Sequence, residues 1–288
     1  MIVPVYNDAE RACECLDALE QQTYPPDRYE VVVVDNASTE PIAPLLGRYP
    51  HAVPEFEAQP GSYAARNRAF RVARGDIFAF TDSDCIPSPR WIEQGVLGLE
   101  TQSADLIAGR VDVFPALKDR PNSVESYEII HAFRQEKYVE LGFAPTVNLF
   151  AFRHVFDSIG PFDARLKSGG DKDWTSRAVA AGHRLAYHDG AAVMHPARRS
   201  LRELNQRLAR IAGGHFDRSR GNRKELMRER LYVAVRILAP AKLAAHLLLG
   251  SVPLAFGDRL KVILVGVLAN WSYVVEWVRL ELGAPARR

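Results

Sequence analysis

Cysteine is scarce in this sequence, with only Cys13, Cys15 and Cys85 among 288 residues. These three thiols make no disulfide framework, and none of them forms the Cys-x-x-Cys pair of a structural zinc site. Reduced cysteines are typical of proteins in a reducing compartment. The chain also starts directly with an expected strand at 2–5 in place of a signal peptide. These features predict a cytoplasmic protein.

Long uninterrupted apolar runs are also missing, although hydrophobic residues make up 47% of the chain. The two most apolar stretches, 231–256 and 262–278, contain Arg236, Pro240 and Glu276 among other interrupting residues. A helix that crosses a membrane needs about 20 apolar residues in succession. We therefore expect both stretches to lie in the interface of a membrane rather than to span it.

The net charge of +2 hides an uneven distribution. Residues 1–197 carry 19 Lys and Arg against 28 Asp and Glu, whereas 198–230 carry 11 against 4 and 231–288 carry 7 against 3. This polarity predicts an anionic partner for the basic part. An amphipathic basic stretch at 200–211 favours an anionic membrane surface, contacted peripherally. Packing of 198–288 on the rest of the chain or on a second subunit stays open, and we expect no nucleic-acid partner.

The first two thirds of the chain alternate between strand and helix patterns. Expected strands cover 2–5, 29–34, 53–57, 76–81, 105–114, 145–152 and 191–194, and expected helices cover 8–22, 61–74 and 123–141, with others beginning near 89 and ending near 181. The valine run at 31–34 is typical of a strand buried on both faces of a parallel sheet. The alternation predicts an α/β fold with a mainly parallel sheet flanked by helices, followed by a C-terminal helical appendage.

Two carboxylates, Asp82 and Asp84, follow directly after the expected strand at 76–81. Like charges this close are costly unless a cation or a proton lies between them. Oxygen ligands at the carboxyl end of a parallel strand suit Mg²⁺ or Mn²⁺, with a diphosphate completing the coordination. Asp35 and Asn36 follow an earlier strand in the same way, so we expect both clusters at one crevice. The alternative is that each is a solvated polar turn.

Four segments carry a resemblance to the family 2 glycosyltransferases of the GT-A fold. They are Val3-Pro4-Val5-Tyr6-Asn7, Val33-Val34-Asp35-Asn36-Ala37-Ser38, Ala65-Arg66-Asn67-Arg68 and Phe80-Thr81-Asp82-Ser83-Asp84, and the likeness extends over about residues 2–197. The resemblance implies a nucleotide-sugar donor, a UDP-sugar first of all, whose diphosphate Asp82 and Asp84 hold through a divalent cation. It also implies that Pro4, Tyr6 and Asp35 line the nucleoside site and that Arg66 lies near the phosphates. Residues 1–197 are then a GT-A catalytic domain, and 198–288 form a basic and apolar helical region.

A second acidic segment, Gly170-Asp171-Lys172-Asp173, begins the expected helix that ends near 181. A carboxylate there can cap the helix, or it can take the proton of an attacking hydroxyl. The segment resembles the Glu-Asp segment that carries the catalytic base in the family, with Gly170 in place of Glu. We assign the base to Asp171, with Asp173 as its rival. By the same resemblance His195 is a third metal ligand, and an imidazole suits Mn²⁺ better than Mg²⁺.

The resemblance implies an inverting glycosyltransferase that acts on a hydroxyl of a glycan or lipid-linked acceptor. We expect it to serve cell-surface polysaccharide or glycolipid synthesis at the inner face of the plasma membrane. A phosphohydrolase is an alternative, because an apolar strand ending in Asp-x-Asp also begins that site, but its pattern expects Thr or Val where Ile86 stands. Another alternative is an inactive module that binds sugar nucleotides. A nucleotidyltransferase of similar fold would need a glycine-rich loop in place of Tyr6-Asn7-Asp8.

Overall fold

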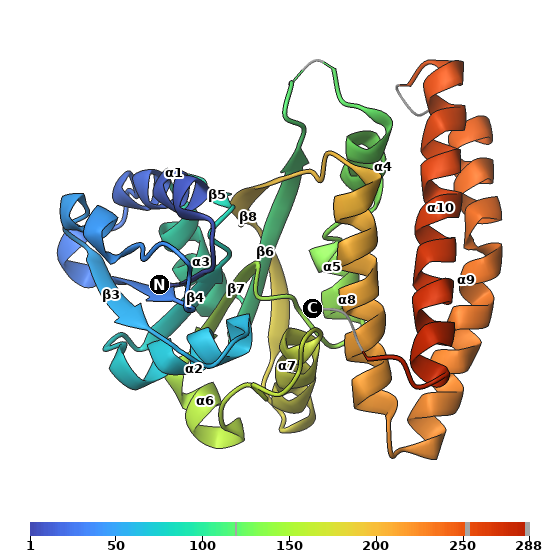
Figure 1. Cartoon of the computed structure of the whole chain (residues 1–288). Helices are drawn as coiled ribbons and strands as arrows, with labels where there is room; N and C mark the ends of the chain where they lie inside the picture. The colour runs from blue at the N-terminus through green and yellow to red at the C-terminus, as the bar shows by residue number, and fades with distance from the viewer. Residues whose placement is uncertain (119, 251–253, 286–288) are drawn as a thin grey trace. The chain divides into compact units, whose positions relative to one another are not determined.

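The computed structural model describes residues 1–118, 120–250 and 254–285 (Figure 1). The chain forms two compact units. Unit 1 comprises Met1–Asp112, Phe133–Arg165 and Gly170–Pro196, and unit 2 comprises Val113–Ala132, Leu166–Gly169 and the described part of Ala197–Arg288. Two internal segments, 113–132 and 166–169, therefore belong to unit 2, although the sequence-based division at 197 groups them with the first domain.

Unit 1 is organised around one mixed sheet. Its strands are β1 (Ile2–Val5), β2 (Val31–Asp35), β3 (Ala52–Phe56), β4 (Ile77–Thr81), β5 (Ile86–Pro87), β6 (Leu106–Phe114), β7 (Asn148–Phe152) and β8 (Leu185–Pro196). They lie in the order β3-β2-β1-β4-β7-β6-β8-β5. The neighbours from β3 to β4 run parallel, whereas β7 pairs antiparallel with β4 and β6, and β5 pairs antiparallel with β8.

The parallel part of the sheet follows from the residues that form it. All five residues of β2 are buried, and its four valines have the β-branched side chains that pack well between two helical layers. The expected α/β fold, with helices around the sheet and further helices at the C-terminal end, is confirmed (Figure 1). Because β1, β2 and β4 are parallel, the loops that follow them emerge at the same edge.

The helices of unit 1 are α1 (Ala9–Glu20), α2 (Ser62–Val72), α3 (Trp91–Thr101), α5 (Gln135–Glu140), α6 (Arg153–Ile159) and α7 (Gly170–Ala180), with 3-10 helices at Pro26–Arg28 and Ala43–Arg48. Those of unit 2 are α4 (Ser123–His131), α8 (Leu201–Ser219), α9 (Arg223–Leu249) and α10 (Phe256–Glu281). The prediction of one helix over 123–141 is wrong, because α4 ends at His131 and α5 starts at Gln135. Between them Phe133 has φ 50°, which a right-handed helix cannot contain.

A buried asparagine ties the antiparallel part of the sheet together. The Asn148 side chain on β7 is fully buried and accepts a hydrogen bond from Trp91 Nε1 on α3 at 2.9 Å. Its amide nitrogen donates to the carbonyls of Arg110 on β6 and Ala191 on β8 at 2.8 and 2.9 Å. A side chain at Gly109 would clash with Ala191 and Asn148, so glycine is needed for this close approach. The Asn148 side chain therefore joins β7 to α3, β6 and β8.

Unit 2 contains a buried carboxylate that joins two of its segments. Glu128 on α4 is 2% exposed and pairs with Arg198 at 2.9 Å and with Arg207 on α8 at 2.7 Å. Burial alone would raise the pKa of this carboxyl, but the two guanidinium groups and the Arg198 hydrogen bonds hold it below its usual value. A charge removed from water in this way is tolerated only with such partners, so these arginines have a structural role.

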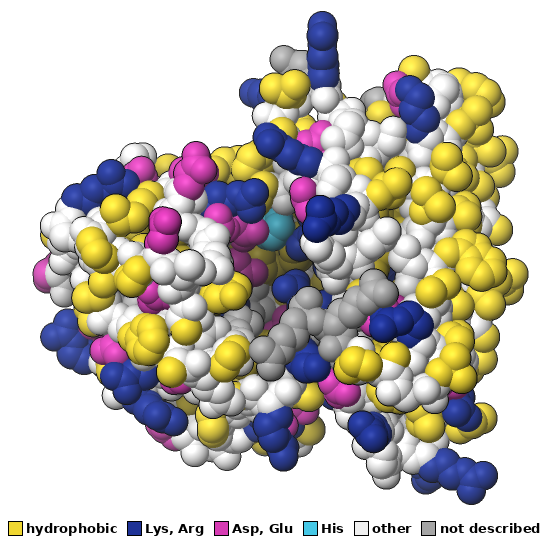
Figure 2. Space-filling model, in the orientation of Figure 1, with side chains coloured by type: hydrophobic (Ala, Val, Ile, Leu, Met, Phe, Trp, Pro, Cys, Tyr) yellow, Lys and Arg dark blue, Asp and Glu magenta, His cyan; other side chains and the backbone are white. Residues whose placement is uncertain are grey.

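Much of the apolar surface of unit 2 is exposed. Figure 2 shows hydrophobic side chains spread over the C-terminal helices, and those more than half exposed on α9 and α10 are Met227, Leu231, Val235, Ile237, Leu238, Leu249, Phe256, Leu264, Trp271 and Val275. Helix α9 continues through Pro240, so this proline interrupts the apolar run without ending the helix. Among the described residues, α9 and α10 are long and apolar enough to cross a membrane, since each contains an 18-residue stretch with a mean hydropathy of 1.5 and 1.3 respectively.

Candidate active site

The loops after β1 and β2 are locked to each other at the carboxyl edge of the parallel strands. Asp35 ends β2 and is 5% exposed. Its Oδ1 accepts a hydrogen bond from the Ser38 amide at 2.9 Å, and its Oδ2 accepts one from the Ile42 amide at 3.3 Å. The Ser38 hydroxyl accepts in turn from the Asn7 amide at 2.9 Å. The carboxylate of Asp35 is thus held in one orientation at this edge.

Asn36 connects the same edge to the beginning of α2. Its amide nitrogen donates to the carbonyls of Glu57 and Gln59 at 3.0 and 2.7 Å, and its Oδ1 accepts from the Gly61 amide at 2.7 Å. Tyr6 follows β1 with 63% of its surface exposed, which leaves its ring available for stacking.

Pro4 lies within β1 opposite Val34. Proline has no amide hydrogen, so it cannot donate to the sheet at this position. Of the three residues predicted to line the nucleoside site, Pro4 lies in β1, Tyr6 lies in the loop after β1, and Asp35 ends β2.

Arg66 on α2 brings a buried positive charge to Asp82. The guanidinium is 3% exposed, and its Nη2 lies 2.6 Å from Asp82 Oδ1. Its Nε is buried and has no hydrogen-bond partner within the described part of the chain. Because an unpaired buried donor costs free energy, this atom suits a site that is completed by an anionic ligand. Asp82 keeps 38% of its side chain exposed and can contact such a ligand.

Tyr63 lies one helical turn before Arg66 and reaches the second acidic segment. Its hydroxyl donates to Asp171 Oδ1 at 3.3 Å, and the Arg66 guanidinium lies 5.9 Å from its ring centre. Burial, together with the nearby Asp171 charge, raises the pKa of Tyr63, so the hydroxyl stays protonated. Residues three apart share one face of a helix. This face of α2 therefore connects Asp82 with Asp171, and Tyr63 was not predicted from the sequence.

The packing of Tyr63 also accounts for Gly170. A Cβ at position 170 would lie 2.7 Å from the Tyr63 ring, so a glutamate there would require the ring to move. Asp171 lies in the first turn of α7. Asp173 pairs instead with Arg177 at 3.0 Å, and Arg177 also donates to backbone carbonyls before α7. The carboxylate of Asp171 is the one positioned by α2, whereas that of Asp173 belongs to a local ion pair.

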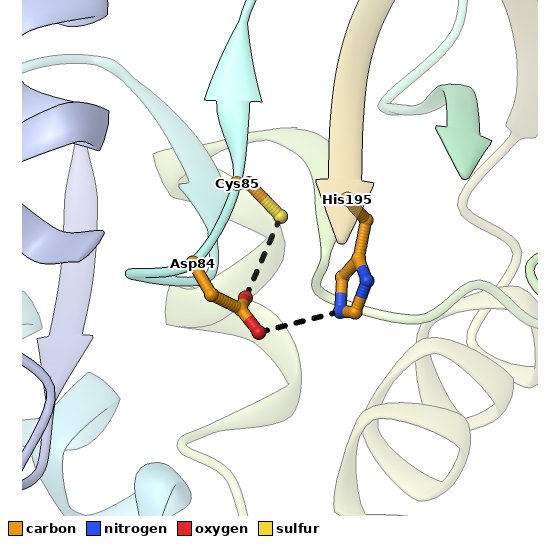
Figure 3. Close-up of side chains that lie close together, drawn as sticks. All are labelled: Asp84, Cys85 and His195. Atoms are coloured by element: carbon orange, nitrogen blue, oxygen red, sulfur yellow. Dashed lines mark hydrogen bonds and ion pairs between the residues drawn. The ribbon is translucent and has the colours of Figure 1, made fainter. Parts of the chain in front are cut away.

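Asp84 and His195 face each other at the end of β8 (Figure 3). His195 is 4% exposed, and its Nδ1 lies 2.8 Å from the Pro196 carbonyl. A carbonyl can only accept, so Nδ1 carries a proton, and Nε2 is the nitrogen that faces Asp84 Oδ2, 3.6 Å away. A proton or a cation between Nε2 and this carboxylate would satisfy both atoms. The backbone hydrogen bond on the other nitrogen is also the one that metal-binding histidines make.

Cys85 completes the group of side chains in Figure 3 but differs from the others in charge. Its Sγ donates to Asp84 Oδ1 at 3.9 Å. Burial raises the pKa of the Cys85 thiol well above its usual value, and the negative charges of Asp84 and Asp82 add to this. A protonated thiol is a poor ligand. Asp84 and His195 are therefore the two side chains of this group that suit a divalent cation such as Mn²⁺, and Asp82, whose Oδ1 contacts Arg66, is not part of the group.

The structure links the sequence-predicted residues of unit 1 in three separate groups, which no direct contact between their carboxylates joins in the described part of the chain. Asp82 reaches Asp171 through Arg66 and Tyr63, and Asp84 contacts His195. Asp35 is connected to the same edge through its neighbour Asn36, which holds the residue before α2. The signal that could have found Tyr63 is an aromatic residue one turn before the arginine on a helix otherwise rich in alanine.

Comparison with known sequences gives one family and several curated relatives. The family described as Glycosyl transferase family 2 matches residues 1–165. The glycosyltransferase AglE of Haloferax volcanii is 37% identical over 225 residues, which make up 75% of this chain and 72% of AglE.

Comparison with solved structures gives a common fold. A mannosyltransferase from Pyrobaculum calidifontis, PcManGT, solved with GDP-Man and Mn²⁺, superposes with a TM-score of 0.65 at 20% identity, over 96% of this chain and 86% of that one. Residues 1–349 of TarS from S. aureus, solved with UDP-GlcNAc, give a TM-score of 0.56 at 16% identity, over 98% of this chain and 91% of that one. The fold is that of the GT-A glycosyltransferases.

Proposed function

The chain belongs to glycosyltransferase family 2, and we propose that it transfers a sugar from a nucleotide-diphospho-sugar to an acceptor hydroxyl with inversion at the anomeric carbon. The observation that carries the proposal is the shared face of α2. Through Arg66 and Tyr63 this face connects Asp82, on the donor side, with Asp171, the proposed base. A displacement in one step needs both groups beside the same carbon atom.

The donor would lie along the carboxyl edge of β1, β2 and β4. Pro4, Tyr6 and the oriented carboxylate of Asp35 would contact the nucleoside, and the unpaired Nε of Arg66 would donate to a phosphate oxygen. The structures solved with UDP-GlcNAc and with GDP-Man support a nucleotide-sugar of this type. We propose a UDP-sugar as the donor to test first.

A divalent cation, Mn²⁺ or Mg²⁺, would be held by Asp82, Asp84 and His195. The facing side chains of Asp84 and His195, and the Mn²⁺ present in the PcManGT complex, support this assignment. When bound, the cation would neutralise charge on the departing diphosphate as a Lewis acid. Arg66 would add a fixed positive charge on the same side.

Asp171 would act as the general base. As the acceptor oxygen bonds to the anomeric carbon, the bond from that carbon to the diphosphate oxygen breaks and its electron pair leaves with the nucleoside diphosphate. The acceptor proton moves to Asp171 Oδ2, because Oδ1 already accepts hydrogen bonds from Tyr63 and from the Lys172 amide. Asp173 is the weaker candidate, since Arg177 engages its carboxylate.

The acceptor would belong to cell-surface glycan synthesis, as a glycan or a lipid-linked molecule at the cytoplasmic face of the membrane. The relative TarS, named as a poly(ribitol-phosphate) β-N-acetylglucosaminyltransferase, supports a polymeric acceptor of this kind. Exposed apolar side chains on α9 and α10, beside a segment rich in arginine, support attachment to an anionic membrane. The protein should float with anionic liposomes at low salt, and full recovery in the soluble fraction would refute attachment.

A transfer assay tests the proposed reaction. UDP-sugars and GDP-mannose would be incubated with membrane lipid extracts and Mn²⁺, and proton NMR would give the anomeric configuration of the product. We expect a glycoside of inverted configuration from one donor. A retained configuration would overturn the single displacement. Binding without transfer or hydrolysis would favour the inactive module, and release of phosphate from a simple phosphomonoester would revive the phosphohydrolase.

A further inference from the structure

A second cluster of metal-binding side chains lies at the other edge of the sheet. It consists of Asp105, which precedes β6, His154 in the first turn of α6, and His183 between α7 and β8. One ligand atom of each residue lies within 4.8 Å of those of the other two. All three residues belong to unit 1.

The strand register places this cluster away from the proposed donor site. Ile77, at the amino end of β4, pairs with Phe152, and His154 follows two residues later. The carboxylates of Asp82 and Asp84 follow the opposite end of β4. The twelve-residue strand β8 likewise separates His183, before its first residue, from His195 near its end.

The hydrogen bonds of His183 aim a lone pair into the cluster. The Ser158 hydroxyl donates to the Val155 carbonyl at 2.9 Å, so its oxygen is left to accept from His183 Nε2 at 2.6 Å. With a proton at Nε2, Nδ1 is the nitrogen left to bind an ion. It lies 3.8 Å from Asp105 Oδ2, so the imidazole nitrogen and the carboxylate oxygen face each other across a gap that a cation can fill.

The other two side chains are placed to close the same site. His154 Nε2 lies 2.9 Å from Asp105 Oδ1, and the Asp105 carboxylate is oriented by the Arg184 amide, which donates to Oδ2 at 2.8 Å. The ring of His154 is 56% exposed, so its proton can shift to Nδ1 and be solvated, which frees Nε2 as a ligand. The exposed side also leaves room for a water as a fourth ligand.

We propose that Asp105, His154 and His183 form a second metal site, which takes Zn²⁺ or a similar transition-metal ion. Two imidazoles, a carboxylate and a water are a donor set that Zn²⁺ accepts in tetrahedral geometry, whereas Mg²⁺ prefers oxygen ligands alone. The hydrogen bond that Ser158 accepts from His183 is the outer contact that fixes the tautomer of a metal-binding histidine. The ion would join the starts of β6, α6 and β8, and so stabilise unit 1 on the side away from the donor.

Cobalt binding tests the site, because tetrahedral Co²⁺ gives visible absorption bands. The His195→Ala protein, stripped of metal with a chelator, isolates the cluster from the proposed catalytic ion. We expect one Co²⁺ per chain, displaced by Zn²⁺ and not by Mg²⁺. Adding His154→Ala, at an exposed position where folding is not in question, should weaken binding at least about 100-fold. Adding His51→Ala, whose ring contacts the single carboxylate of Glu20, is the matched control and should leave binding unchanged.

Thermal unfolding gives a second readout. Zn²⁺ should raise the unfolding midpoint of the His195→Ala protein and leave that of the His154→Ala/His195→Ala protein unchanged. Absence of Co²⁺ binding to the His195→Ala protein would overturn the proposal. Equal binding by the proteins with and without His154 would overturn it as well. Neither result depends on the donor, the acceptor or the transfer reaction.

Discussion

Two buried charges, one in each unit, are paired in different ways. In unit 1 Arg66 contacts Asp82 and keeps a donor atom without a partner in the described residues. In unit 2 the buried carboxylate of Glu128 is satisfied by two arginines, and the outer faces of α9 and α10 are apolar. The difference concerns these two residues and not every buried charge, because Arg236 Nη1 in unit 2 is also buried without a hydrogen-bond partner in the described residues. Incomplete pairing beside a half-exposed carboxylate such as Asp82 suits a site that binds a charged ligand, whereas the complete pairing of Glu128 is typical of a structural contact.

The largest effect is expected in unit 1, at the proposed base Asp171. Asp171→Asn should lower kcat about 1,000-fold, because a general base contributes roughly 10²–10⁴-fold. Binding of the donor should not change, since the amide keeps the shape of the side chain. Steady-state transfer and titration calorimetry on the same preparation measure both quantities.

Asp173→Asn is the matched control for this variant. It should retain most of the transfer activity, because Arg177 already engages Asp173. The reverse pattern, with Asp173→Asn inactive and Asp171→Asn near normal, would exchange the two roles.

A smaller effect is expected at Tyr63, which we regard as a positioning residue. Tyr63→Phe removes the hydrogen bond to Asp171 and keeps the ring that packs on Gly170. The loss of one hydrogen bond, about 1.4 kcal/mol, corresponds to a roughly 10-fold lower kcat with an unchanged KM for the donor. Tyr187→Phe removes a similar bond to Asp189 elsewhere in unit 1 and should leave both constants unchanged. Equal kinetic constants for the two variants would show that Tyr63 does not position Asp171.

The smallest expected effect concerns unit 2 and pH. The folded-state pKa of Glu128 lies below its usual value of 4.5, so its ion pairs stabilise the folded state above that pH. This stability is lost as the pH falls through the lowered folded-state pKa. The midpoint of thermal unfolding, measured from pH 7 down to acidic pH, should therefore fall as the pH falls. Glu128→Gln should largely remove this fall. An identical pH profile for the two proteins would show that Glu128 is not the group responsible.

Local patterns predicted the parts of the fold and site that depend on neighbours in sequence. The valine run and the alternation of strands and helices predicted β1 to β4. The polar residues Asp35 and Asn36 at the end of β2 and the acidic pair Asp82 and Asp84 after β4 were predicted from their position at strand ends. The break at Phe133 could not be predicted, because a left-handed residue there depends on packing such as the contact of its ring with His195. Tertiary contacts override helix propensity in such cases.

The contact between Tyr63 and Asp171 could not be predicted from the sequence either, since the two residues are 108 positions apart. The same contact accounts for the one departure from the family pattern, Gly170, which a sequence alone presents only as a mismatch. Likewise, the proton position on His195 follows from the Pro196 carbonyl and could not be deduced from the residue type. These features depend on side-chain placement between distant segments.

The central claim is that the carboxyl edge of the parallel strands binds a nucleoside diphosphate through Asp82, Asp84 and a divalent cation. Titration calorimetry of UDP and GDP, with Mn²⁺ and with a chelator, tests this most directly. We expect one nucleotide to bind the unmodified protein only when Mn²⁺ is present, and we expect Asp82→Ala to abolish that binding. Binding of equal strength with the chelator, or by Asp82→Ala, would contradict the claim.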